Sequence, residues 1–197
     1  MTDLFPNWIE GLATIEQQLT VGLLILATLV TLAYLLLTPL RSWQEQRQIR
    51  YAIKRIGARV MRDVNLPDGI GGVINIDYLV LSSDAILVIG VKRYDGIIFG
   101  SANTDEWTQT VNSRSYRFPN PDVYLAQQLS AVRTIAPKVP VKGLHLFTDT
   151  ATFPWDQPDN VLQVKDLLSS NITRPGLKDI PADLGTAWKK LSKSRQR

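Results

Sequence analysis

Residues 19–40 constrain the fold more than any other stretch, because the 22 residues LTVGLLILATLVTLAYLLLTPL contain no charged side chain. A helix rises about 1.5 Å per residue, so this length matches the roughly 30 Å hydrocarbon core of a bilayer. Buried helices of soluble proteins, the alternative, seldom remain uncharged for so long. A cleavable signal peptide would need a preceding basic residue and a small-residue cleavage site, whereas the run ends in Pro39-Leu40-Arg41. We predict one retained transmembrane helix at residues 19–40, after an N-terminal segment at residues 1–18.

The two flanks of this run differ in charge. Residues 1–40 contain no lysine or arginine, whereas residues 41–62 contain seven basic side chains and one acid, Glu45. Basic residues next to a membrane helix favour the cytoplasmic side. We therefore expect a single-pass protein of the cell membrane, with its N-terminus outside and its main domain in the cytoplasm. Residues 41–58 have the pattern of an amphipathic helix. Anionic lipid is the expected partner of residues 41–62, with nucleic acid as the alternative.

The remaining chain has the size and composition of one globular domain, which we place at residues 55–188. No cysteine occurs in the 197 residues, which excludes disulfides, thiolate metal sites and a cysteine nucleophile. The formal net charge is +4, yet residues 63–188 contain 10 basic and 14 acidic side chains. A broad basic surface for duplex nucleic acid is therefore not expected there. Residues 189–197 form a basic tail without acids, which is either solvated or in contact with nucleic acid or lipid.

A hairpin formed by residues 73–81 and 85–91 is predicted at the centre of the domain. Both runs are apolar on both faces and rich in β-branched residues, as expected of central, buried strands. Ser83-Asp84 is the expected two-residue turn. Residues 96–100 are predicted to continue the hairpin as a third short strand.

Two ionisable side chains, Asp77 and Lys92, interrupt this apolar hairpin. With a two-residue turn, Asp77 lies directly opposite Gly90, so that Asp77, Gly90 and Lys92 share one face. Asp77 and Lys92 are then diagonal neighbours about 7 Å apart. A buried charge is costly unless it is paired, liganded or solvated. The two residues are therefore expected to form either a buried ion pair or part of a site.

Periodicity and turn residues predict the other elements. Strands are expected at residues 60–66, 106–111, 115–118, 141–148 and 161–164, and helices at residues 120–135 and 180–191. The predicted class is an α/β fold, with a mixed β-sheet flanked by helices and preceded by the transmembrane helix. The single histidine, His145, lies in an apolar run and is expected to be a hydrogen-bonded core residue rather than a catalyst. The sequence offers neither a second member of a serine triad nor a phosphate-binding glycine loop.

An acid on one strand, followed on the next strand by acid-x-Lys, is the arrangement of the PD-(D/E)xK nucleases, which share the core of restriction endonucleases. The ordered series I-D-Y, I-G-V-K, D-G-I-I-F-G, a tryptophan strand and an N-P helix start resembles the nuclease-related domain (NERD) family over residues 55–150. A preceding membrane span also occurs in that family. The resemblance implies that Asp77 binds metal, that Lys92 is the catalytic lysine, and that Asp95, Gly96 and Trp107 are framework positions. In such nucleases Mg²⁺ is held by carboxylates, and the lysine steadies the attacking water or the charge of the transition state.

The chain departs from the family pattern at two acidic positions. The acid expected two residues before the lysine is Gly90, and the glutamate expected after the glycine that ends the preceding helix is Ala58. Asp63, on the first strand, is the one substitute acid. With Asp77 as the single assured metal ligand, Mg²⁺ is expected to bind weakly, and no cofactor is assured.

A third departure concerns the glutamine of the family's N-P-x-x-Q helix start, which is Tyr124 here. Gln127 and Gln128, one turn later, are the candidate binding residues. The preferred interpretation is a membrane-anchored, catalytically degenerate nuclease relative, a pseudo-nuclease that binds nucleic acid or a protein partner. One alternative is an active, Mg²⁺-dependent, membrane-tethered nuclease that recruits Asp63. The second is an adaptor for a lipid surface or a protein.

Overall fold

The computed structural model describes residues 6–69, 71–155 and 157–196, without the side chains of residues 6–16 and 37–41. Residues 1–5 of the predicted N-terminal segment lie outside the described residues. The chain divides into two compact units, Met1–Gln46 and Arg47–Arg197.

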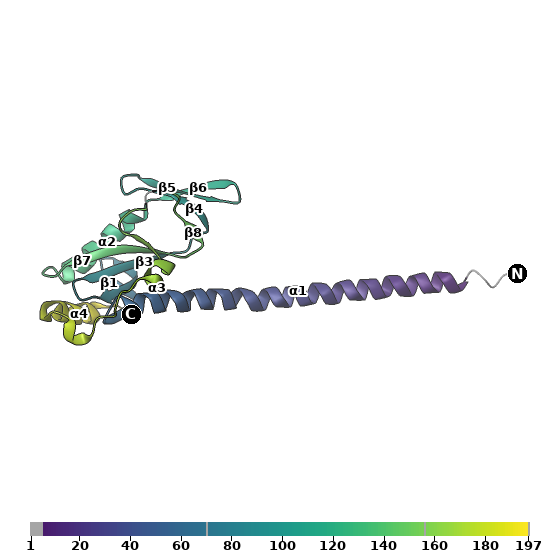
Figure 1. The fold of residues 1–197 in the computed structure, drawn as a ribbon, viewed down its shortest axis with the longest axis horizontal. Helices are drawn as coiled ribbons and strands as arrows, with labels where there is room; N and C mark the ends of the chain where they lie inside the picture. Colours follow the sequence, from purple (N-terminus) through teal and green to yellow (C-terminus); the bar gives the residue numbers. More distant parts are fainter. Residues whose placement is uncertain (1–5, 70, 156, 197) are drawn as a thin grey trace. The chain divides into compact units, whose positions relative to one another are not determined.

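The first unit contains most of helix α1 (Pro6–Arg55), drawn in purple and blue in Figure 1. Its stretch Gln17–Leu36 is long and apolar enough to cross a membrane, a test that signal sequences and buried core helices also pass. Three threonine hydroxyls in this stretch donate to carbonyls of the same helix, which satisfies them without water. The segments predicted at residues 19–40 and 41–58 thus belong to one continuous helix that ends at Arg55.

The second unit is built around a five-stranded sheet with the order β1-β2-β3-β7-β9. Its strands are β1 (Arg59–Pro67), β2 (Val73–Leu81), β3 (Ile86–Lys92), β7 (Val141–Phe147) and β9 (Val161–Gln163). Strands β1, β2 and β3 pair antiparallel, whereas β3, β7 and β9 run parallel. The apolar strands β2, β3 and β7 are interior, and β9 is an edge strand, as predicted.

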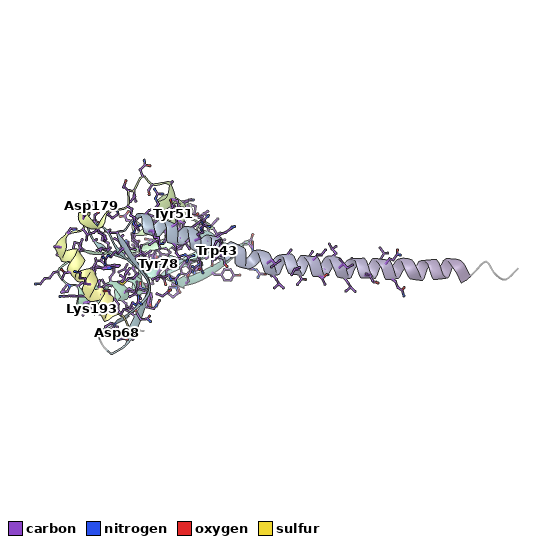
Figure 2. The ribbon with its side chains drawn as sticks, turned by 90° about the horizontal axis from the view of Figure 1, so that it is seen from below. Trp43, Tyr51, Asp68, Tyr78, Asp179 and Lys193 are labelled. Carbon is purple, nitrogen blue, oxygen red and sulfur yellow. The ribbon has the colours of Figure 1, made fainter. Side chains whose placement is uncertain are left out.

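Helices cover both faces of this sheet. On one face, residues 47–55 of α1 and helix α3 (Val164–Ser169) enclose a core that includes Val80, and Tyr78, labelled in Figure 2, packs against it. On the other face, α2 (Pro121–Ile135) and α4 (Ala182–Ser194) pack over a core that includes Leu79. Neighbouring residues of a strand point to opposite faces, so each face has its own apolar layer. The predicted α/β fold, with a mixed sheet flanked by helices, is confirmed.

A second sheet has the order β6-β5-β4-β8. Its strands are β4 (Gly96–Phe99), β5 (Glu106–Val111), β6 (Arg114–Pro119) and β8 (Ala151–Thr152) (Figure 1). Trp107 is fully buried in its core and stacks on Phe147 of β7. The prediction that residues 96–100 continue the hairpin was therefore wrong, because they belong to another sheet. The chain turns at Gly96, where φ is +81° and where a side chain would meet the Thr110 carbonyl.

The predicted register of the central hairpin is confirmed. Leu81 pairs with Ile86, and Tyr78 pairs with Ile89, which is the register of a two-residue Ser83-Asp84 turn. The Ser82 N–H donates to the Ala85 carbonyl at 3.0 Å and closes this turn. Pairing between β2 and β3 extends from the turn to Tyr78. It does not include Asp77, the residue that precedes Tyr78 in the sequence.

Candidate functional site

The candidate site lies at the carboxyl ends of the parallel strands β3 and β7. Lys92 is the last residue of β3, and His145 on β7 pairs with Gly90. Helix α2 begins at Pro121 and contributes Asp122 to the same place, because Asp122 contacts His145. In open α/β sheets, ligands bind outside the carboxyl ends of the strands.

Asp77 occupies the point where β2 separates from β3. Its Oδ2 accepts the Val91 backbone N–H at 2.7 Å, which replaces the main-chain partner that β2 no longer provides. One acceptor site of the Asp77 carboxylate is thus used by the backbone. Asp77 is also partly buried, so fewer of its acceptor sites remain for a ligand at this point of the sheet.

The separated end of β2 is held by helix α2. The Asn75 carbonyl accepts the side-chain amide of Gln128 at 2.7 Å and the Tyr124 hydroxyl at 3.1 Å. Gln128 is buried, whereas Gln127 is exposed. Of the two glutamines predicted as binding residues, Gln128 therefore holds the strand that carries Asp77, and Gln127 faces solvent.

Lys92, the last residue of β3, is partly buried. Burial lowers the pKa of its amine, and the negative charge of Asp77 opposes part of this effect. Among the described ion pairs with an N–O distance of 4.0 Å or less, none joins Asp77 to Lys92. The two charges interact through space without the close contact of a salt bridge.

Gly90 leaves space for a side chain between His145 and Lys92. A Cβ atom at this position would lie 3.7 Å from His145 Nδ1 and 3.8 Å from Lys92 Cε. Both distances are ordinary van der Waals contacts. The neighbouring atoms therefore do not exclude a side chain at the position where the family places an acid.

His145 is almost fully buried, with 1% of its surface exposed. Burial lowers the pKa of its imidazole and favours the neutral form, while the hydrogen bond to Asp122 acts in the opposite direction. Nε2 lies 2.8 Å from Asp122 Oδ1, and since an ionised carboxylate can only accept, Nε2 carries the proton. Nδ1 then has a free lone pair, and it is the one buried side-chain polar atom without a hydrogen-bond partner among the described residues.

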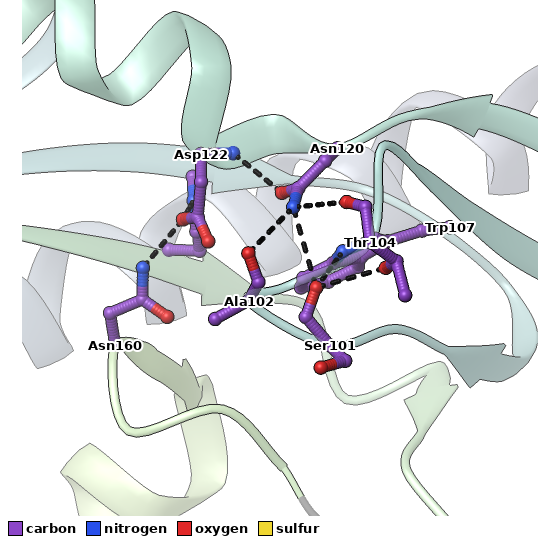
Figure 3. Close-up of polar contacts among 8 residues, drawn as sticks. Ser101, Ala102, Thr104, Trp107, Asn120, Asp122 and Asn160 are labelled. Atoms are coloured by element: carbon purple, nitrogen blue, oxygen red, sulfur yellow. Dashed lines mark hydrogen bonds and ion pairs between the residues drawn. The ribbon is translucent and has the colours of Figure 1, made fainter.

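Asp122 and Asn160 complete this side of the site. Asn160 Nδ2 donates to Asp122 Oδ1 at 2.6 Å (Figure 3), and the Asn160 carbonyl accepts the His145 backbone N–H at 2.7 Å. The sequence indicated Asp122 only as a residue of a helix start. It gave no signal for Asn160, because the three residues meet through tertiary packing of α2, β7 and the chain before β9.

Asn120 fixes the start of α2 to the loop of the second sheet. Its Oδ1 accepts the Asp122 backbone N–H at 2.9 Å, and its Nδ2 donates to the Thr104 carbonyl at 2.7 Å and to the Ser101 carbonyl at 3.3 Å (Figure 3). The Trp107 indole donates to the same Ser101 carbonyl at 3.0 Å. Asn120 therefore caps the start of α2 with its Oδ1 and joins it to the loop of the second sheet with its Nδ2.

Asp63, the predicted substitute acid, lies opposite Asp77 in the β1–β2 register but points elsewhere. Its φ is +50°, its side chain is 71% exposed, and its Oδ2 pairs with Arg62 Nε at 2.9 Å. Burial raises the pKa of Tyr78, the neighbour of Asp77 that packs on the α1 face, Arg62 opposes this, and the charge of Asp63 adds to it. Asp63 is therefore turned toward solvent and Arg62.

Ala58, the second position expected to be acidic, lies at the far end of β2. Its N–H donates to the Leu81 carbonyl at 2.8 Å, and Leu81 is about 13 Å along the strand from Asp77 at 3.3 Å per residue. Among the described residues, no three His, Asp or Glu side chains gather as a metal site. Asp77, Asp122 and His145 do not form such a group either, and Mg²⁺ prefers several oxygen ligands together.

Comparisons with known proteins identify the family of this chain. The sequence model of the nuclease-related domain family, NERD, matches residues 41–148, more than half of the chain. A relative in Bacillus anthracis, described as an uncharacterized protein, is 31% identical over 62 residues, which cover 32% of this chain and 29% of that protein. No solved structure matches. From the family match and the nuclease-like α/β domain, we conclude that the chain belongs to the NERD family.

Proposed function

We propose that this NERD protein is held at a membrane by its apolar helix and binds nucleic acid there without metal-dependent cleavage. The observation that carries the proposal is Gly90, a residue without a carboxylate at the strand position beside Asp77, Lys92 and His145. Asp77 also accepts a hydrogen bond from Val91, and among the described residues no three metal-binding side chains gather here, so few oxygen ligands are offered to a hard cation.

The binding function rests on the groups that remain. Lys92 offers a positive charge at the carboxyl end of β3, and the N-terminus of the 15-residue helix α2 adds the partial positive charge of its dipole at the same end of the sheet. Phosphate is the anion that nucleic acids present repeatedly. A local contact of this kind suits a domain without a broad basic surface.

Membrane attachment and orientation form the second part of the proposal. Gln17–Leu36 is the candidate span, and the basic residues that follow it favour an outside N-terminus, a cytoplasmic domain and contact of residues 41–62 with anionic lipid. The absence of native cysteine allows a direct test. A cysteine introduced at Ser101 should resist a membrane-impermeant maleimide until the cells are opened, whereas labelling in intact cells would reverse the orientation.

The function is tested with the full chain in lipid nanodiscs, with and without Mg²⁺. We expect salt-dependent binding of labelled oligonucleotides, no cleavage, and weaker binding for Lys92→Ala. Lys142→Ala is the matched control, because Lys142 is an exposed lysine paired with Asp84 at the opposite end of the sheet. Mg²⁺-dependent cutting abolished by Asp77→Ala would establish the active-nuclease alternative instead. Absence of any nucleic-acid binding would favour the adaptor.

A further inference from the structure

A pocket of about 570 Å³ adjoins the candidate site. One wall is the loop after β4, including Ser101, and the other is the chain before β9, including Trp155 and Asn160. The Asn160 side chain also donates to Asp122 at 2.6 Å. The pocket and the His145–Asp122 pair therefore share a residue.

Trp155 is the most prominent feature of this pocket. Its side chain is 79% exposed, the largest exposed fraction among the described large hydrophobic side chains of the chain. The ring of Phe99 lies 5.2 Å from the indole, at 54° to its plane, and supports it from the second sheet. An exposed indole with such support offers a flat apolar surface to a ligand at small cost in side-chain entropy.

The walls around Trp155 are fixed by hydrogen bonds. The Ser101 carbonyl accepts from Trp107 and Asn120 (Figure 3). On the opposite wall, Gln157 Nε2 donates to the Val161 carbonyl at 2.6 Å. A preformed pocket loses little entropy when it binds a ligand.

We propose that this pocket binds one unstacked base of a single-stranded nucleic acid, with the base against Trp155. The inference rests on the proposed function and adds the class of nucleic acid. Bases stack on exposed aromatic rings whatever their sequence, and a base held in a duplex cannot present its face in this way. Asp159, which also lines the pocket, disfavours phosphate there and can accept hydrogen bonds from the amino groups of a base.

The test measures fluorescence anisotropy of the full chain in nanodiscs with a labelled single-stranded oligonucleotide and with its duplex. Trp155→Ala should weaken single-strand binding about tenfold and leave duplex binding unchanged. Trp155→Phe should retain most of the affinity, because it keeps an aromatic face. Tyr116→Ala is the matched control, since Tyr116 is a 49% exposed aromatic residue outside the pocket.

Each outcome is decisive. Equal single-strand affinity of Trp155→Ala and the unaltered protein, while Lys92→Ala binds weakly, would overturn the pocket and leave the proposed function intact. Equal losses for single strand and duplex would also overturn it, because the effect would not depend on an unstacked base. If the unaltered protein binds neither probe, the proposed function itself fails, and this inference fails with it.

Discussion

The two halves of the candidate site differ in how completely they are built. On the β7–α2 side, His145, Asp122 and Asn160 are joined by hydrogen bonds of 2.6 to 2.8 Å. On the β2–β3 side, Asp77 bonds to the backbone, and Gly90 contributes no side-chain atom. The framework of the site is thus intact where it positions groups and depleted where a metal would need oxygen ligands. This contrast is the basis of the proposal that the domain binds nucleic acid without metal-dependent cleavage.

The two halves also differ in how much stability depends on their side chains. Asp122 is a partly buried carboxylate that accepts from the buried His145 ring and from partly buried Asn160, and its removal is costly because each donor then lacks its partner. Gly90 has no side chain to accept or donate a hydrogen bond, and buried His145 Nδ1, 3.7 Å from where its Cβ would be, has no partner among the described residues. The polar network of the β7–α2 half is therefore formed at Nε2 and open at Nδ1, on the side of Gly90.

The largest effect is expected from Asp122→Ala. The substitution leaves the donors of buried His145 and of Asn160 without their acceptor, so the free energy of unfolding should fall by about 3 kcal/mol. Urea unfolding of the full chain, followed by tryptophan fluorescence, measures it. Asp122→Asn keeps an acceptor oxygen and should lose clearly less. Equal losses for both variants would show that the acceptor is not what stabilises this half.

A smaller effect is expected when the missing acid is supplied. Gly90→Asp should be destabilised in metal-free buffer by its buried charge and then stabilised by Mn²⁺ or Mg²⁺, by roughly 1.4 kcal/mol at ten times the dissociation constant. Gly90→Ala adds the same Cβ and should not respond to metal. Thermal unfolding with and without the ion measures both. If the unaltered protein were stabilised by the metal as much as Gly90→Asp, the β2–β3 half would not lack the oxygen ligands that a metal needs.

Asp77→Ala should cost less than Asp122→Ala, about 1 kcal/mol, because one backbone N–H loses its acceptor at a partly exposed position. Asp77→Asn retains an oxygen for Val91 and should restore most of this stability. The same urea experiment compares the three variants. A loss for Asp77→Ala larger than that for Asp122→Ala would mean that the β2–β3 half is the more strongly built one.

The smallest effect concerns pH. Burial lowers the pKa of His145 in the folded protein below its ordinary value of 6.5, with Asp122 raising it and Lys92 lowering it further. The unfolded chain therefore binds the proton more readily, so stability should be complete above pH 6.5 and decrease as the pH falls toward the folded pKa. His145→Gln should lack this component.

The single histidine gives this prediction a direct measurement by NMR. The imidazole should titrate below its ordinary pKa in the unaltered protein. In Gly90→Asp it should titrate at higher pH, because a carboxylate beside Nδ1 favours the charged ring. An unchanged imidazole pKa in that variant would show that the space at Gly90 does not face Nδ1.

Local patterns predicted the central hairpin well. The β-branched runs predicted its two strands, and the two-residue turn at Ser83-Asp84 predicted its register, since a turn longer or shorter by one residue would have turned every side chain to the other face. The position of Gly90 across from Asp77 followed from that register alone. The strand predicted at residues 96–100 does form, as β4, but in the second sheet, since the chain turns at Gly96, which has a positive φ.

The sequence by itself determined the apolar helix, the α/β class and the two neighbouring strands that carry Asp77 and, on the second strand, Gly90 and Lys92, because these depend on periodicity and on contacts between neighbouring strands. Only the tertiary structure decided that Asp63 turns to solvent and that Asp122 and Asn160 meet His145. Those outcomes depend on a backbone conformation and on the packing of segments far apart in the chain. Hydrogen bonds between such segments leave no periodic signal in the sequence.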